Sequence, residues 1–264
     1  MVFRAPALII VAHGSKGTGA TPGGLLKVQL QQRLPHFDVG LGFLRVKPKF
    51  APLLDRAQAR SPEDILLFPL FFAQSMIVTK ELPALIRQTA GRPVRLLPPA
   101  GCLPGFSRML ASRIRARLAS NDCGIGKTAV FLISHGRKNE VLPASNLREM
   151  RHAVANMIGI DDVHNVQLEG PAPLQNWRDM TRQRKALFIP LMVGDGDHCL
   201  RDIPDAVNAG INEHIDILAP VGTWWELSHL LADYINRNWR NGGFEPRCSA
   251  AIDRWDLSSC PIAD

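Results

Sequence analysis

The chain has 264 residues, of which 46% are hydrophobic and 21% charged, as in an ordinary globular protein. No run of 18 apolar residues occurs, so the sequence excludes a membrane-spanning helix. The short apolar run at residues 7–11 leads into a His-Gly turn without a small-residue cleavage site, which favours a buried strand over a signal peptide. We therefore expect a cytoplasmic protein without a membrane partner.

The net charge of +7 favours an anionic partner. Arg113, Arg115 and Arg117 cluster, but the other basic residues are spread along the chain, and no recognisable nucleic-acid-binding module accompanies them. We therefore expect no nucleic-acid partner. The 5 cysteines are odd in number and form no Cys-x-x-Cys pair, which argues against a disulfide framework, a zinc ribbon or a four-thiolate cluster.

Short apolar runs alternate with amphipathic segments along the chain. In the first half, strands are predicted at residues 7–12, 39–46, 64–72 and 94–98. Helices are predicted between and after them at residues 23–34, 51–60, 78–89 and 105–118. This alternation is typical of βαβ units around a parallel sheet.

The second half repeats the alternation after a Gly-interrupted seam near residues 121–127. Its strands are predicted at residues 129–134, 163–168, 186–193 and 215–219. Its helices are predicted at residues 145–158, 174–183, 200–211 and 225–239. We expect an α/β protein of two similar lobes, each a four-stranded, mainly parallel sheet flanked by helices. The expected division is a first module over 1–123, a second over 124–240 and an irregular tail over 241–264.

Motifs of the first half recur in the second at a nearly constant offset, which indicates a duplication. Leu-Ile-Ile-Val-Ala-His-Gly at 8–14 corresponds to Val-Phe-Leu-Ile-Ser-His-Gly at 130–136, an offset of 122. An offset of 121 relates the later pairs: Pro69-Leu70-Phe71 and Pro190-Leu191-Met192, Glu81-Leu82-Pro83 and Asp202-Ile203-Pro204, Pro99-Ala100-Gly101 and Pro220-Val221-Gly222.

Candidate site residues follow the predicted strands, where open α/β sheets collect their ligands. His13 and His135 each end the first strand of a half and precede a glycine. His198 follows a strand through a turn with Gly194 and Gly196, and its imidazole is a suitable ligand for Fe, Co, Ni or Zn.

Glu169 adds a carboxylate at the same edge of the second sheet. Asp195 and Asp197 are candidates for orienting His198, whereas Cys199 is expected to face the helix core. The first half has Ile77 at the position of His198, so it has lost one ligand and retains only His13.

These motifs resemble the class II tetrapyrrole chelatases, the CbiX-like sirohydrochlorin cobaltochelatases and ferrochelatases. The resemblance rests on Ala12-His13-Gly14-Ser15, on Ser134-His135-Gly136-Arg137, and on Pro190-Leu191 followed by Gly196-Asp197-His198 and Asp202-Ile203-Pro204. It covers about 220 residues and is closest to the long, two-module form. The second half departs from the motif at Arg137, which replaces serine, and the first half departs at Ile77.

The resemblance implies ATP-independent insertion of a divalent metal into sirohydrochlorin or a related tetrapyrrole, in cobalamin or siroheme biosynthesis. The substrate metal would be cobalt or iron, or else nickel, with no further cofactor, and the protein would be a monomer of two fused modules. His135, Glu169 and His198 would be both the metal-binding and the catalytic residues. Residues expected to contact the acidic macrocycle are His13, Ser15, Arg45, Lys47, Arg137, Gly194 and Gly196, with Lys16 and Lys49 as further candidates.

Two alternatives remain open from the sequence. The loss at Ile77 is compatible with a non-catalytic carrier or regulatory protein that binds a tetrapyrrole or a metal. A hydrolase or phosphotransfer enzyme using His13 or His135 has less support. No Ser-His-Asp pattern is present, and Gly126-Lys127-Thr128 precedes a strand where a phosphate-binding loop would follow one.

Overall fold

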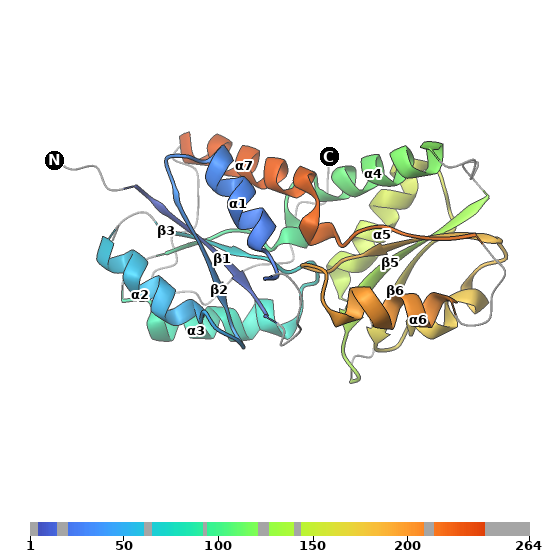
Figure 1. Ribbon diagram of the computed structural model, residues 1–264, viewed down its shortest axis with the longest axis horizontal. Coiled ribbons are helices and arrows are strands. Elements are labelled where there is room, and N and C mark those ends of the chain that lie inside the picture. Colours follow the sequence, from blue (N-terminus) through green and yellow to red (C-terminus); the bar gives the residue numbers. More distant parts are fainter. Residues whose placement is uncertain are drawn as a thin grey trace.

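The computed structural model describes residues 5–14, 21–60, 65–91, 94–120, 127–139, 144–208 and 214–240. Within these ranges the chain forms two parallel four-stranded sheets, in the orders β2-β1-β3-β4 and β6-β5-β7-β8 (Figure 1). The first contains β1 (Ala7–Ala12), β2 (Asp38–Phe43), β3 (Ile65–Pro69) and β4 (Arg95–Leu96). The second contains β5 (Thr128–Gly136), β6 (Val163–Glu169), β7 (Lys185–Pro190) and β8 (His214–Ile217). The predicted α/β class with two similar lobes is confirmed.

Helices cover both faces of each sheet, as the amphipathic segments predicted. In the first half they are α1 (Gly24–Arg33), α2 (Phe50–Arg60), α3 (Leu82–Thr89) and α4 (Phe106–Ser120). In the second half they are α5 (Ser145–Ile158), α6 (Ile203–Asn208) and α7 (Trp225–Arg240). Shorter turns complete the set: π-helical η1 (Ile77–Glu81) and η4 (His198–Asp202), and 3₁₀-helical η2 (Ala100–Cys102), η3 (Leu174–Met180) and η5 (Val221–Thr223). Among the described residues, no helix is both long and apolar enough to cross a membrane.

A single hydrophobic cluster extends beneath both lobes on one side of the molecule. It joins alternate residues of both central strands, such as Leu8 and Leu132, to buried side chains of α1, α4, α5 and α7. Two separate clusters lie on the opposite faces, one under α2 and α3 and the other under η3 and α6. Because successive strand residues point to opposite faces, each buried strand contributes to two of these cores.

The last helix of each half packs over the other half (Figure 1). Helix α7 lies beside α1, with a hydrogen bond from Arg33 Nε to Ser228 Oγ of 3.0 Å, and α4 lies beside α5. Arg117 of α4 forms an ion pair with Asp216 of β8. The shared core and these exchanged helices mean that neither half buries its own apolar faces alone.

Asn146, at the start of α5, ties the second half to the segment that follows β3. Its side chain is 1% exposed, and its Oδ1 accepts a hydrogen bond of 2.9 Å from the Gln74 backbone N–H. Its Nδ2 donates to the Phe72 carbonyl at 2.8 Å. One buried amide therefore holds the segment that leads to Ile77 in place against the opposite lobe.

Of the strands that are shorter than predicted, β3 and β7 each end at a proline. β3 ends at Pro69 instead of residue 72, and β7 ends at Pro190 instead of 193. Proline has no backbone N–H to donate to the neighbouring strand. After Leu70 and Leu191 donate to Val11 and Ile133, the chain leaves each sheet.

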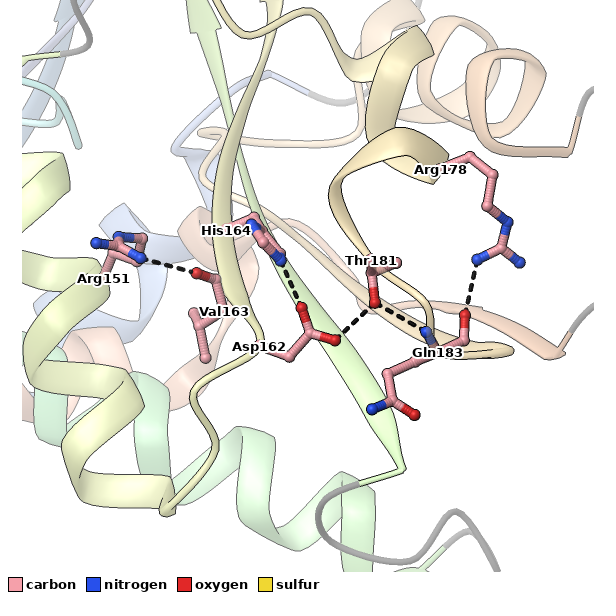
Figure 2. Close-up of polar contacts among 7 residues, drawn as sticks. All are labelled: Arg151, Asp162, Val163, His164, Arg178, Thr181 and Gln183. Carbon is pink, nitrogen blue, oxygen red and sulfur yellow. Dashed lines mark hydrogen bonds and ion pairs between the residues drawn. The ribbon is translucent and has the colours of Figure 1, made fainter.

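The predicted helix over 174–183 is wrong in its second part, because the 3₁₀ turn η3 ends at Met180. Asp162 explains the change: Thr181 Oγ1 donates to its carboxylate at 2.6 Å, and His164 Nε2 lies 2.6 Å from it (Figure 2). The Gln183 backbone N–H donates to Thr181 Oγ1 at 3.0 Å. These side-chain bonds hold Thr181 in extended backbone, with φ −142° and ψ 153°, and replace the helical pattern.

Several sequence expectations lie outside the described residues. They are the boundary near 123–124, Gly124 and Gly126 of the seam, the tail over 241–264, and Cys123, Cys248 and Cys260. Cys102 is buried and accepts a hydrogen bond from Gln74 Nε2, and Cys199 is half-buried.

We expect Asn146→Ala to lower the free energy of unfolding by about 1–3 kcal/mol, because it removes two buried hydrogen bonds, from the Gln74 N–H and to the Phe72 carbonyl. Urea denaturation followed by circular dichroism measures the change. Ser145→Ala is the matched control on the same turn, and it should change stability by less than about 0.5 kcal/mol because its hydroxyl is exposed. Equal effects of the two substitutions would contradict the role of the buried amide.

Candidate metal centre

His135 lies at the carboxyl end of β5, where a sharp turn begins. Gly136 has φ +70°, and a Cβ atom there would lie 1.9 Å from the Glu169 carbonyl oxygen. Only glycine permits both this backbone conformation and this close approach. The imidazole of His135 is exposed, and its Nδ1 lies 3.0 Å from the Gly136 carbonyl oxygen.

His198 begins the π-helical turn η4, which follows the neighbouring strand β7. The sheet order places these two strand ends side by side at the point where the connections diverge, the position at which open α/β sheets bind ligands. Gly194 and Gly196 form the turn before it, and the Gly196 carbonyl accepts backbone bonds from Cys199 and Leu200. Short π-helical turns are frequent at functional sites.

The two imidazoles are in contact at this edge of the sheet. Their ring centroids are 4.9 Å apart and the rings cross at 81°. His198 Nδ1 lies 2.5 Å from Asp202 Oδ2, one helical turn further on. Carbonyl and carboxylate oxygens only accept hydrogen bonds, so in the neutral form of either ring Nδ1 carries the proton. Each Nε2 therefore keeps a lone pair for a metal ion.

Glu169 is the last residue of β6 and pairs in register with Gly136. Its side chain is exposed at the strand end. Among the described residues, however, no group of three or more His, Cys, Asp or Glu lies close enough together to hold a metal ion. The two histidines are thus brought together, while the third position for Glu169 stays a prediction.

His13 occupies the corresponding place in the first module. Its Nδ1 lies 3.0 Å from the Gly14 carbonyl oxygen, as in the second module. Burial lowers the pKa of His13 below 6.5, and the charges of Arg45 and His135 lower it further, while the Gly14 carbonyl and Glu81 act in the opposite direction. His13 is therefore close enough to His135 for their charges to interact, and it is neutral at neutral pH.

The remaining residues expected to bind the macrocycle lie near these turns. Arg137 follows Gly136 and is exposed, and Arg45, Lys47 and Lys49 are exposed after β2. Lys49 Nζ donates to the Arg45 carbonyl at 2.7 Å, which directs the lysine back to its own strand end. Ser15 and Lys16 lie outside the described residues.

The sequence interpretation missed Asp202 as the partner of His198, because it considered Asp195 and Asp197 first. The spacing of four residues on a helix was the available signal, since such side chains are neighbours. Asp195 acts elsewhere: burial and then its charge raise the pKa of the Cys199 thiol to about 12. That thiol packs partly against the core beneath α6 and is protonated at neutral pH.

A second missed contact lies in the first module. Arg45 Nη2 donates to Glu81 Oε2 at 2.5 Å, and both side chains are about half exposed. Ile77 begins the π-helical turn η1, at the same position that His198 has in η4. The first module therefore has the backbone of the site without its second imidazole.

Residues of the first module match a known protein family. The family model described as CbiX matches residues 7–117. No protein of curated function matches the sequence significantly.

Three solved structures share the fold over most of their length. The CbiX of siroheme biosynthesis in denitrifying bacteria has a TM-score of 0.69 and 20% identity, covering 88% of this chain and 98% of its own. SirB from Bacillus subtilis with Fe³⁺ has a TM-score of 0.67 and 15% identity, covering 91% and 98%. Sirohydrochlorin chelatase SirB from Bacillus subtilis subspecies spizizenii with cobalt has a TM-score of 0.66 and 16% identity, covering 91% of this chain and 98% of its own. Residues 7–117 therefore match the CbiX family model, and the described residues as a whole share the fold of these CbiX and SirB structures.

Proposed function

We propose that the protein inserts a divalent metal, Co²⁺ or Fe²⁺, into sirohydrochlorin or a related tetrapyrrole without ATP, as one two-module chain. The observation that carries the proposal is the contact between His135 and His198 at the diverging strand ends, with both Nδ1 atoms engaged. The CbiX match and the fold shared with SirB, which has been solved with Fe³⁺ and with cobalt, support it.

In this proposal His135 and His198 receive the metal through Nε2, and Glu169 supplies a third ligand when metal is present. Two imidazoles and one carboxylate leave positions open for the ring nitrogens. Asp202 holds the ring of His198 and raises its basicity as a ligand. Cys199 takes no part, because its thiol is protonated.

The reaction must also remove two protons from the ring. The free macrocycle carries two inner N–H groups, and both protons leave as the dication enters. His13 is neutral and has a free Nε2, since the Gly14 carbonyl engages Nδ1. We infer that His13 accepts one of these protons and passes it to water, as a general base close to the metal.

Charge complementarity would hold the macrocycle. Sirohydrochlorin carries eight carboxylates, and the net charge of this chain is +7. Arg45, Lys47 and Arg137 are exposed at strand ends that flank the histidines, where they can pair with carboxylates. Gly194 and Gly196 have no side chain and would allow the ring to approach the backbone. Ser15 remains a candidate contact from the sequence.

A carrier or regulatory role for the same site is the second candidate. It is favoured by Ile77, which leaves the first module without the second imidazole. Such a protein would bind metal or macrocycle through the same histidines without catalysing insertion.

Incubation with sirohydrochlorin and Co²⁺, then Fe²⁺, tests the proposal through the absorbance change on insertion. We expect a rate at least about tenfold above the enzyme-free control, and the faster metal would identify the subtype. A macrocycle that binds without faster insertion would support the carrier role. A protein that neither binds nor accelerates would refute both.

Among the histidines, we expect His198→Ala and His135→Ala to return the rate to that of the enzyme-free control. His13→Ala should be milder, about 10²-fold or less, because it removes a base and leaves both metal ligands. The imidazole of His198 is 48% exposed, so its loss opens no core cavity and the fold should remain.

Cys199→Ala is the matched control next to His198, and it should keep the rate within about twofold because its thiol is protonated. A larger loss in His13→Ala than in His135→Ala would place the working site in the first module instead.

We expect the pKa of His13, measured by NMR titration, to lie below 6.5 and to rise in Arg45→Ala. Removal of a positive charge makes protonation easier, so the change is upward. The rise should be partial, because burial is the largest cause of the shift. Lys47→Ala is the control and should leave the value unchanged; an equal rise there would attribute the effect to net charge alone.

A further inference from the structure

The hydrogen-bonding pattern gives the correspondence between the two modules residue by residue. Ala12 pairs with Phe43 just before His13, and Ser134 pairs with Gln167 just before His135. The isolated bridges Phe43 to Lys49 and Gln167 to Pro173 repeat the match. Two residues beyond these pairs, Arg45 of the first module takes the place of Glu169 in the second.

The π-helical turns extend the correspondence. η1 begins at Ile77 and ends at Glu81, whereas η4 begins at His198 and ends at Asp202. The two ends carry the same kind of group, a carboxylate, but its partner differs. Asp202 accepts a hydrogen bond from His198, and Glu81 accepts one from Arg45.

These replacements change the charge that a metal ion would meet. The second module offers two histidines and the two carboxylates of Glu169 and Asp202, with the guanidinium of Arg137 after Gly136. The first module offers one histidine, and the guanidinium of Arg45 cancels the charge of Glu81. The Nζ of Lys49, held at the Arg45 carbonyl, adds another positive charge nearby. The side chains of the second module therefore attract a dication more strongly than those of the first module.

Arg45 therefore does more than remove one carboxylate. Its Nη2 lies 2.5 Å from Glu81 Oε2, so it also occupies the carboxylate that would orient an imidazole at position 77.

We propose that Arg45 keeps divalent metal out of the first module and so restricts the chain to a single metal site, at His135 and His198. The inference rests on the proposed function in taking those two histidines as the metal site. Replacing Ile77 with histidine would therefore not be enough to bind metal. The new imidazole would lie near the positive charge of Arg45, and Glu81, which would orient it, is already paired with Arg45.

Co²⁺ binding to the purified chain and its variants tests this directly, by equilibrium dialysis and by the visible absorption of bound Co²⁺. We expect about one Co²⁺ per chain in the unsubstituted protein and in Ile77→His. The double variant Arg45→Glu/Ile77→His should bind about two, because it restores a ligand set of the second-module type. Lys47→Glu/Ile77→His is the matched control, with the same charge change two residues away, and should stay at about one.

A second Co²⁺ in Ile77→His alone, or in the Lys47 control, would overturn the role of Arg45. The double variant staying at the level of Ile77→His, with an unchanged circular dichroism spectrum and melting temperature, would overturn it too. If the proposed function is wrong, the unsubstituted chain would bind no Co²⁺. The difference in bound Co²⁺ between Ile77→His and the double variant would still test the role of Arg45.

Discussion

The parallel pairing of β5 with β7 is the constraint on which the candidate site depends. It places the end of β5, with His135, beside the segment that leaves β7 and reaches His198. β7 ends at Pro190, Leu191 makes the last backbone hydrogen bond to Ile133 of β5, and the chain then turns through two glycines into η4. The ring contact of 4.9 Å thus follows from strand order and from where each strand stops.

Much of this arrangement could be predicted from the sequence because it repeats. The apolar strands, the His-Gly turns and the offset motifs all follow local patterns, and the observed β1 and α5 have the predicted bounds. The 3₁₀ turn at η3 could not be predicted, since it depends on a hydrogen bond between Thr181 and Asp162, 19 residues apart. The hydrogen bond between His198 and Asp202 has a local spacing, but two nearer acids obscured it. The ion pair of Arg45 and Glu81 joins residues that are 36 positions apart in the sequence, so no local sequence pattern predicts it.

The two modules carry side chains of different charge on the same backbone arrangement. Both modules have a glycine after the histidine and a π-helical turn that ends in an acid. Both also have a side chain two positions after the residue that pairs just before the histidine, Phe43 or Gln167. In the second module these positions carry Glu169, His198 and Asp202, and in the first they carry Arg45, Ile77 and Glu81. Backbone geometry is set by strand pairing and glycine, whereas affinity for a cation is set by a few exposed side chains.

This separation explains how the CbiX family model can match residues 7–117, the module that lacks the second imidazole. A domain is held together by its buried strands and turns, and exposed ligands contribute little to that stability. The first module also cannot be dispensed with, because α7 packs beside α1 and α4 beside α5 in one continuous core. Removing it would expose apolar faces of the second module and would remove His13 from the surroundings of His135. The first module is therefore needed to bury the apolar faces of the second module, and it brings His13 close to the candidate metal centre there.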